Sequence, residues 1–286
     1  MKQSNDKSIR RPTSIAPVTV FYRDQIRTKQ DTVIAEEPLE IRLHNLWSDP
    51  KPFATILRTP GNDFELATGF LFSQGEITSK DDIHTICYCN LSEDELQSYN
   101  IVTVTLRTPL KNEAHKSKWI DSACGACGNT SIQEIENGSF QKNLSTIRID
   151  ASTVFKLPSL LRKNQQLFTK TGSVHAAGVF TQTGNAEFVR EDVGRHNAVD
   201  KVLGACILAN YKKHGESILA LSGRIAFELV QKTSAANIPI IVAIGAPSSL
   251  AISLAKRAGI TLCGFATQDT FNVYTYPERI TNDPKL

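Results

Sequence analysis

Alternation of apolar and polar residues dominates the first part of the chain. A period of two, carried by β-branched and aromatic side chains, predicts half-buried strands. These strands are predicted at Val18 to Tyr22, Leu39 to Leu43, Ile83 to Cys89 and Ile101 to Leu106. Pro60 and Gly61 interrupt the strand pattern, and the apolar residues that follow predict a helix from Phe64 to Ser73. The first part is therefore predicted to be α+β.

The second half alternates regularly between strands and helices. Strands are predicted at Val174 to Phe180, Glu187 to Val189, Ser217 to Leu221, Ile240 to Ile244 and Ile260 to Phe265. Helices are predicted at Asn197 to Ala209, Ile225 to Ala236 and Ser248 to Ala258. Elements in this order predict a three-layer α/β/α domain with a largely parallel sheet. Val199, Val202 and Cys206 share one face of the first helix, and this face is predicted to pack on the sheet.

Two domains and a tail are predicted from these patterns. Residues 1–17 are polar and basic with few large apolar groups, which predicts a mobile tail. A helix predicted from Ser152 to Gln166 opens the second domain. The smaller N-terminal α+β domain is thus assigned residues 18–146, including the cysteine loop described below, and the α/β domain residues 147–286.

Composition excludes several classes of protein. The chain has 286 residues and a formal charge of +3, which is too small to predict nucleic-acid binding. It contains no run of about 20 apolar residues, so a membrane span is not predicted. The polar, basic start lacks the layout of a secretory signal, and the cytoplasm is the expected compartment.

Cysteine placement gives the first candidate for chemistry. Six cysteines, at positions 87, 89, 124, 127, 206 and 263, are too sparse for a disulfide framework. Cys206 and Cys263 lie in apolar stretches and are expected to be buried. Cys124 and Cys127 lie three residues apart in a predicted loop, each followed by glycine. An accessible thiolate in such a pair can form and pass on a persulfide.

A structural zinc site is the main alternative for the same loop. Cys87 and Cys89 would supply two further thiolates beside Cys124 and Cys127. A spacing of one residue between two thiolate ligands is unusual for a zinc knuckle, whose paired cysteines are typically separated by two to four residues. This weighs against zinc, so no tightly bound metal is expected, but the spacing alone leaves the site open.

The segment Glu191 to Asn197, EDVGRHN, is the second candidate. Capping of the following helix by Asp192 or Asn197 is one interpretation. The other is a polar site in which Arg195 and His196 contact a phosphate or a pterin. The role of Glu191 is left open between capping and catalysis.

Two further turns follow strands and precede helices in the same way. These are Ser222 to Arg224 and Gly245 to Ser249. Backbone N–H groups at helix starts attract anions, although capping by Ser222 or Ser248 also explains each turn by itself. Ligands of open α/β sheets bind at the carboxyl ends of the strands, so the turns are predicted to line one crevice with Arg195.

The strand TGSVHAA contains an incomplete deaminase signature. His175 matches the histidine of the H-x-E sequence of zinc deaminases, but Ala177 replaces the glutamate and no P-C-x-x-C follows. Deaminase chemistry is therefore not predicted, whereas a deaminase-like fold remains compatible. A lone histidine in an apolar strand is more often a core residue than a ligand.

Seven segments together resemble the formate dehydrogenase accessory sulfurtransferase family, FdhD, over residues 18–280. In chain order they are RTPGNDFELATGFLFSQGEI, CGACG, TGSVHAAGVF, EDVGRHNAVDKVLG, LSGRIAFELVQK, APSSLAISLAKRAGITLCGF and FNVYTYPER. The resemblance implies a cytidine-deaminase-like fold for the second domain and a homodimer.

The resemblance also implies a function. Family members are thought to take sulfur from a cysteine desulfurase as a cysteine persulfide. They pass it to the bis(molybdopterin guanine dinucleotide) form of the molybdenum cofactor, a bound substrate, before its insertion into the catalytic subunit of formate dehydrogenase. By this resemblance Cys124 is the persulfide cysteine and Cys127 its partner.

The same resemblance assigns cofactor binding to the stretch Phe265, Ala266, Thr267, Gln268, Asp269 and Thr270. Family members commonly have a basic residue in this loop, but this chain has neither Arg nor Lys there. Backbone N–H groups of the loop, or Arg195 and Arg224 from neighbouring loops, would then hold the dinucleotide.

Two other functions remain as alternatives. One is a zinc-stabilised chaperone that binds and delivers the cofactor without moving sulfur. The other is a dithiol oxidoreductase, which ranks last because the C-x-x-C pair does not open a helix after a strand.

Overall fold

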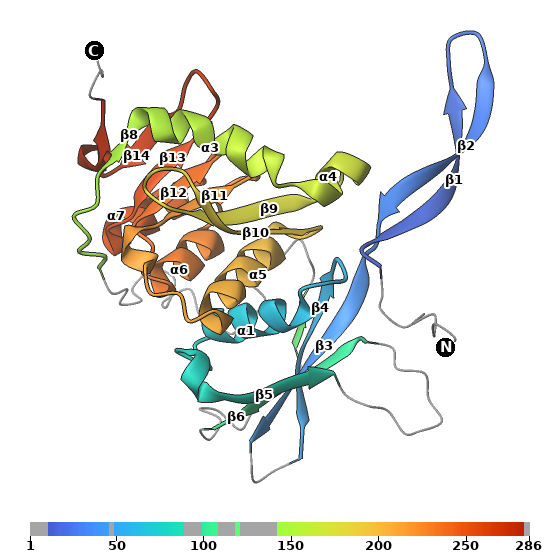
Figure 1. Cartoon of the computed structure of the whole chain (residues 1–286), viewed down its shortest axis with the longest axis horizontal. Coiled ribbons are helices and arrows are strands. Elements are labelled where there is room, and N and C mark those ends of the chain that lie inside the picture. The colour runs from blue at the N-terminus through green and yellow to red at the C-terminus, as the bar shows by residue number, and fades with distance from the viewer. Residues whose placement is uncertain (1–10, 46–48, 89–98, 108–117, 121–141, 283–286) are drawn as a thin grey trace, which may run out of the picture.

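The computed structural model describes residues 11–45, 49–88, 99–107, 118–120 and 142–282. Two sheets with helices packed on them, a helix on the first and several on the second, form the body of the molecule, and a two-stranded hairpin projects from it (Figure 1). The α+β part followed by a three-layer α/β part confirms the predicted fold class. None of the helices in the described ranges has the length and apolar character that a membrane crossing needs.

The first sheet has five strands in the order β5-β6-β3-β4-β7. Their bounds are β3 Glu37–Asn45, β4 Lys51–Arg58, β5 Ile83–Tyr88, β6 Ile101–Leu106 and β7 Lys118–Ile120. Helix α1, Asp63–Ser73, packs Leu66 and Phe70 into the same core as Leu39 and Ile56. The predicted strands and helix of this part are thus confirmed.

The second sheet has six strands in the order β10-β9-β11-β12-β13-β14. Their bounds are β9 His175–Phe180, β10 Ala186–Asp192, β11 Ile218–Leu221, β12 Ile240–Ala243, β13 Thr261–Gly264 and β14 Asn272–Thr275. Strands β11, β12 and β13 are parallel to one another, whereas β9, β10 and β14 are antiparallel to their neighbours. The prediction of a largely parallel sheet is therefore corrected to a mixed sheet. The physical reason is the short turn after Phe180, which joins β9 to β10 as a hairpin.

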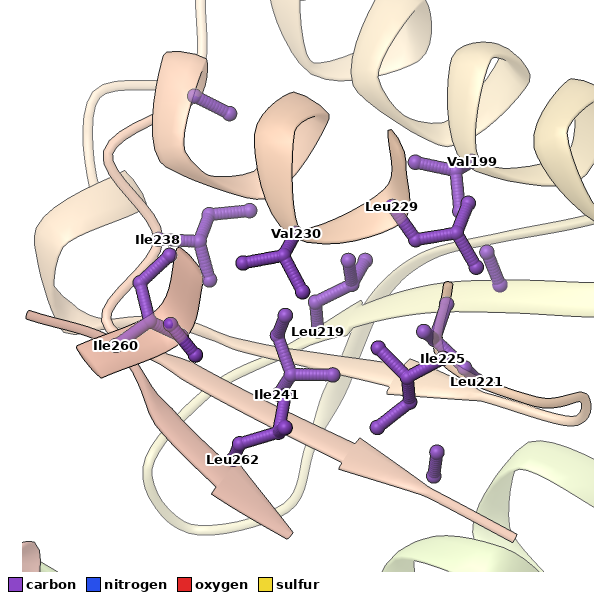
Figure 2. Packing of buried hydrophobic residues seen from close by; sticks show 14 of the residues in the cluster. Val199, Leu219, Leu221, Ile225, Leu229, Val230, Ile238, Ile241, Ile260 and Leu262 are labelled. Atoms are coloured by element: carbon purple, nitrogen blue, oxygen red, sulfur yellow. The ribbon is translucent and has the colours of Figure 1, made fainter. Parts of the chain in front are cut away.

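Alternate residues of the central strands face two separate helical layers. Ile218 and Ala220 of β11 pack with α3, Ala151–Lys163, on one face. Leu219 and Leu221 pack on the other face, under the remaining helices (Figure 2). Those helices are α5 Arg195–Leu208, α6 Phe227–Ala235 and α7 Ser249–Ala258. This alternation produces the three layers predicted for the second domain.

The short elements tie the end of the chain to the middle. Strand β8, Ile149–Asp150, pairs in parallel with β15, Ile280–Thr281. The backbone N–H of Asn143 donates to the carbonyl of Ala258 at 2.8 Å, so the chain from residue 142 onward lies on the second unit. The predicted domain boundary at residues 146/147 stays a prediction, because residues 121–141 lie outside the described part.

A hairpin replaces part of the predicted tail. Strands β1, Thr13–Phe21, and β2, Ile26–Ile34, pair antiparallel along their whole length. The prediction of a mobile tail over residues 1–17 is therefore wrong from Thr13 onward, because pairing with β2 satisfies the backbone of these residues. Residues 1–10 lie outside the described part.

Two glycines bring α1 and α5 into backbone contact. A Cβ atom at Gly69 would lie 1.8 Å from the carbonyl oxygen of Asp200, and one at Gly204 would lie 1.8 Å from that of Glu65. Only a residue without a side chain fits at either position. This close helix crossing fixes the first unit onto the second (Figure 1).

Candidate functional site

Three loops meet where the parallel strands end. We call them the strand-end edge: Ser222–Arg224 after β11, Ile244–Ser248 after β12 and Phe265–Thr270 after β13. The N–H of Gly245 donates to the carbonyl of Gly223 at 3.3 Å, and the N–H of Phe265 donates to that of Gly245 at 3.3 Å. A Cβ atom at Gly245 would lie 2.6 Å from the Gly223 oxygen, so the close approach requires glycine. The structure thus brings together the loops that the sequence predicts to line one crevice.

The backbone of the Phe265–Thr270 loop is largely occupied within the protein. Phe265 and Ala266 donate their N–H groups to carbonyls of the β12 end, Gly245 and Ala243. The N–H of Thr267 donates to the Thr270 carbonyl at 2.8 Å, and its hydroxyl accepts from the N–H groups of Asp269 and Thr270. Five of the six backbone donors therefore already have acceptors, which favours side chains over this loop's backbone as phosphate ligands.

The side chains of this loop differ in what they offer. Ala266 is buried, whereas Gln268, Asp269 and the two threonines are exposed. Phe265 has a left-handed backbone, with φ of 52°, and its ring is half exposed. An exposed aromatic side chain held on a turn can stack on a planar ligand.

The predicted cations lie beside one another, with different exposure. Arg195 is the first residue of α5, and its Cβ lies 3.9 Å from a Cβ built on Gly223. Arg224 is exposed, one residue further along the same turn. His175 lies half-buried at the start of β9, where burial and the positive charge of Arg195 lower its pKa. A neutral imidazole and two guanidinium groups therefore lie at or beside the strand-end edge.

His196 lies inside the protein rather than on this edge. Its ring is 4% exposed, and Nε2 lies 3.8 Å from Oε2 of Glu228 on α6. The neighbouring His196 imidazole lowers the pKa of the Glu228 carboxyl. Within the described part of the chain, neither ring nitrogen has a hydrogen-bond partner. His196 thus has unused bonding capacity but no exposed surface to offer a large ligand.

A hollow of about 560 Å³ opens beside the strand-end edge. Its lining includes Ser222 and Ile244 of the edge, His175, and Arg162 and Gln165 from the α3–α4 region. The Arg162 guanidinium lies 3.8 Å above the ring of Phe168 in α4, Gln166–Thr171. Sequence reasoning missed this hollow because helical spacing alone did not reveal that Arg162 lies near the start of β9.

One buried donor in the lining has no acceptor among the described residues. Gln165 is 3% exposed, and its Nε2 atom makes no hydrogen bond there. A buried amide without a partner is costly, and such groups are rare outside ligand and water sites. Gln165 lines the hollow, so this buried donor and the guanidinium–aromatic platform border the space that a planar polar ligand would fill.

Most of the polar residues in EDVGRHN have structural partners. Glu191 accepts from the N–H groups of Leu167 and Phe168, at 2.8 and 2.9 Å, and so caps the start of α4. Asp192 accepts from the N–H of Gly194 and from the amide of Asn197, at 2.8 and 2.9 Å. These contacts support the capping interpretation for Glu191, although the helix it caps is α4 rather than α5.

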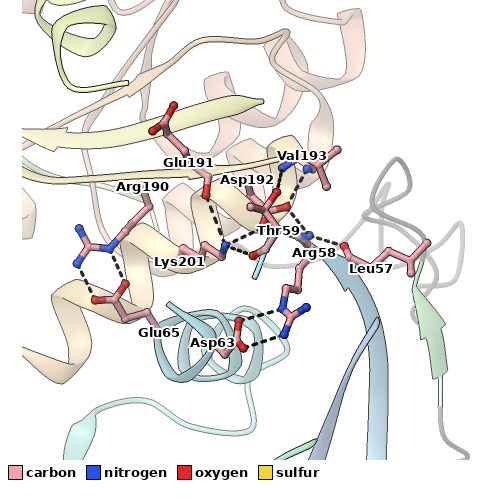
Figure 3. A network of polar contacts seen from close by, with 12 residues as sticks. Leu57, Arg58, Thr59, Asp63, Glu65, Arg190, Glu191, Asp192, Val193 and Lys201 are labelled. Atoms are coloured by element: carbon pink, nitrogen blue, oxygen red, sulfur yellow. Dashed lines mark hydrogen bonds and ion pairs between the residues drawn. The ribbon is translucent and has the colours of Figure 1, made fainter. Parts of the chain in front are cut away.

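Asp192 also fastens the first unit to the second (Figure 3). Its Oδ2 lies 2.7 Å from Nζ of Lys201 and accepts from the N–H of Thr59 at 3.1 Å. Lys201 in turn donates to the Thr59 carbonyl at 2.8 Å. We call these contacts, with the nearby Arg58–Asp63 pair, the joint. It connects the segment RTPGND to the segment EDVGRHN, which are 133 residues apart at Thr59 and Asp192.

Cys124 and Cys127 lie outside the described residues. Before them, β7 pairs with β4 through Ile120 and Ile56, three residues ahead of Thr59 at the joint. Of the other zinc candidates, Cys87 is a free, exposed thiol on β5, and Cys89 lies outside the described part. The described residues contain no cluster of three potential metal ligands, and the four-thiolate site stays untested.

A mixed α/β protein with a hollow beside its parallel strand ends belongs to a class that binds ligands there. The FdhD/NarQ family model matches residues 34–281. The chain is 41% identical over 273 residues to the sulfur carrier protein FdhD of Mycolicibacterium paratuberculosis, covering 94% of this chain and 98% of the relative. It is 40% identical over 265 residues to the protein of that name from Sulfurisphaera tokodaii, with 92% and 98% covered.

A solved structure agrees in fold. The putative formate dehydrogenase accessory protein from Desulfotalea psychrophila superimposes with a TM-score of 0.75 at 27% identity, over 94% of this chain and 100% of that one. The chain belongs to the FdhD/NarQ family.

Proposed function

We propose that this protein is a sulfur carrier in the maturation of formate dehydrogenase. Support comes from its family, from relatives named sulfur carrier proteins, and from the CGACG segment, which supplies the chemistry that such a name requires. The observation that carries the proposal is the similarity over nearly the full length of these relatives.

In detail, Cys124 takes sulfur from a cysteine desulfurase as a persulfide, with Cys127 as the second thiol. The sulfur then passes to the bis(molybdopterin guanine dinucleotide) molybdenum cofactor, before the cofactor enters the catalytic subunit of formate dehydrogenase. Two of the described cysteines, Cys206 and Cys263, are unsuited to this role. Burial raises the pKa of Cys206 and of Cys263 to about 12, so neither forms a thiolate near neutral pH.

The strand-end edge and its hollow are the proposed site of the cofactor. The phosphates of the dinucleotide would pair with cationic side chains. Its guanine rings would stack on a flat side chain and accept hydrogen bonds from protein donors. Arg224 and Arg195 fit the phosphates, and the Arg162–Phe168 platform with the Gln165 amide fits a planar ring. The residues present therefore suit the substrate even though residues 265–270 contain no cation.

The described chain before Cys124 ends at Ile120 of β7, which pairs with β4 on the side of the molecule that carries the joint. Cys124 is four positions after Ile120, and a step of four positions spans at most about 14 Å. Ile120 pairs with Ile56, which leads through Arg58 to Thr59, where the N–H of Val193 donates to the Thr59 hydroxyl at 3.0 Å. Val193 also lines the hollow. The position of Ile120 thus supports transfer from Cys124 to a cofactor held at the strand-end edge.

Rescue of formate dehydrogenase activity in a strain lacking this protein tests the proposal. Cys124→Ala should abolish rescue while the purified variant keeps the wild-type circular dichroism spectrum. Cys87→Ser is the matched control, since this exposed thiol has no part in the transfer and its removal should leave rescue intact. Full rescue by Cys124→Ala would refute the sulfur carrier. Loss of rescue with Cys87→Ser, together with stoichiometric bound zinc, would instead favour the zinc-stabilised chaperone.

A further inference from the structure

The hairpin of β1 and β2, residues 13–34, stands away from both sheets (Figure 1). We call it the arm. Helix α4 lies beside its base, while its tip, closed by a hydrogen bond from the N–H of Tyr22 to the carbonyl of Gln25, points away from the body. A two-stranded hairpin is at best marginally stable in water unless one face packs on something else.

The two faces of the arm differ in charge. Cross-strand partners share a face, so the register assigns every residue to one side. One face contains the charged residues Arg27, Lys29 and Asp31. The other face carries no charge and consists of Thr13, Ile15, Pro17, Thr19, Phe21, Ile26, Thr28, Gln30, Thr32 and Ile34. Phe21 pairs with Ile26 near the tip, and the two are 74% and 61% exposed.

Exposed large apolar side chains gather at two places in the described part of the chain. The arm contributes Ile15, Phe21, Tyr22 and Ile26. The strand-end edge and the first turn of α7 contribute Ile244, Leu250 and Phe265. Leu144 alone lies elsewhere. Exposed apolar clusters of this kind mark interaction surfaces.

We propose that the arm of one protein molecule packs its uncharged face over the strand-end edge of a second copy of the same chain. One chain carries both apolar surfaces, yet within it they stay exposed, because the arm tip points away from its own body. A twofold axis relates such a pair of contacts, so each arm covers the other molecule's edge.

The area of the arm favours the reciprocal arrangement. Nine residues per strand give a ribbon about 30 Å long and about 10 Å wide, so one face covers about 300 Å². A single arm against another surface would bury about 600 Å² in total, which is typical of incidental contacts. Two reciprocal arms bury about 1,200 Å², the lower end of specific interfaces.

The second copy would then complete the ligand site. Phe21 and Ile26 of the partner copy would lie against Phe265 and Ile244, which border the hollow and the loop proposed for the cofactor. The part played by this cover in cofactor binding rests on the proposed function, whereas the contact between copies does not.

Photo-crosslinking of the purified full-length protein tests the contact without any readout of sulfur transfer. Benzoylphenylalanine replaces Phe21 on the uncharged face or, as the control, Lys29 on the charged face of the same arm. Illumination of the first variant should give a product of twice the 31.5 kDa chain mass, crosslinked to peptides containing Ile244, Leu250 or Phe265. The Lys29 variant should not crosslink to these peptides. Crosslinks within one chain, or to any other surface of a second copy, would overturn the proposal.

Sedimentation velocity supplies the second test. Ile26→Asp places a charge on the uncharged face and should raise the dimer dissociation constant at least about tenfold, since it buries an unpaired charge. Lys29→Glu on the opposite face should leave that constant within about threefold of the wild-type value. A monomeric wild-type protein at tens of micromolar, or an unchanged dimer with Ile26→Asp, would refute the arm exchange. Dimerisation only upon addition of a desulfurase would refute it as well.

Discussion

The joint and the strand-end edge lie on either side of the EDVGRHN turn, but they differ in how far their polar groups are hydrogen-bonded within the protein. At the joint, Asp192 accepts hydrogen bonds from Thr59, Gly194 and Asn197 and pairs with Lys201. Beside the strand-end edge, the buried Gln165 amide lacks a partner among the described residues, and Arg224 is exposed. A region whose polar groups are all satisfied holds a structure together, whereas one with spare donors and exposed cations is suited to a ligand.

Removal of Lys201 should produce the largest effect on stability. Lys201→Met leaves Asp192 as a buried carboxylate without its cation and should reduce the free energy of unfolding by about 3–5 kcal/mol. Urea denaturation followed by circular dichroism measures the loss.

The double variant Lys201→Met with Asp192→Asn separates the ion pair from simple packing. It should lose clearly less stability than the sum of the two single variants, because it leaves no unpaired charge. Additive losses would show that the joint does not depend on the pair, and the contrast with the edge would weaken.

The helix crossing should respond to a single methyl group. Gly204→Ala places a Cβ atom 1.8 Å from the Glu65 carbonyl and should cost about 1–3 kcal/mol, because two helix backbones must separate. Gly215→Ala is the matched control, since the nearest atom to its new Cβ lies 3.9 Å away on Asn237. Its melting temperature should stay at or slightly above the wild-type value. Equal melting temperatures for both variants would contradict the close packing of α1 on α5.

The edge should show the reverse behaviour, with little change in stability and a loss of binding. Gln165→Leu removes an unpaired donor and should change the free energy of unfolding by less than about 0.5 kcal/mol. The affinity for GDP, a probe that carries the guanine and phosphates of the cofactor, should fall about three- to tenfold in isothermal titration calorimetry. Gln166→Leu at the exposed neighbouring position is the control. Unchanged GDP binding by Gln165→Leu would remove the hollow from the proposed site.

Much of the architecture could be predicted because it is determined by local patterns. The continuous apolar run Ile240–Ala243 is typical of a buried strand and the apolar stripe of α5 of a packed helix, and the structure places both as predicted. The loops of the strand-end edge were predictable as well, since parallel strands end on one side. Strand β2 was missed because Arg27 to Thr32 is polar throughout, so no alternation marks it.

The pairings of charged residues could not be predicted, because they join distant segments. Asp192 pairs with Lys201 and accepts a hydrogen bond from Thr59. Glu191 accepts one from Leu167, which lies 24 residues earlier in the chain at the start of α4. His196 was predicted to contact a ligand but lies against Glu228 in the interior. Charge and residue type indicate that partners exist, but only the fold determines which groups meet.

The central claim is that sulfur travels on Cys124, and intact-protein mass spectrometry tests it most directly. The wild type, Cys124→Ala and Cys127→Ala proteins are each incubated with a cysteine desulfurase and cysteine, and their masses are compared before and after reduction. The account predicts a reducible sulfur adduct on the wild type and on Cys127→Ala, and none on Cys124→Ala. An adduct that persists on Cys124→Ala, or a wild-type protein that gains no sulfur, would contradict it.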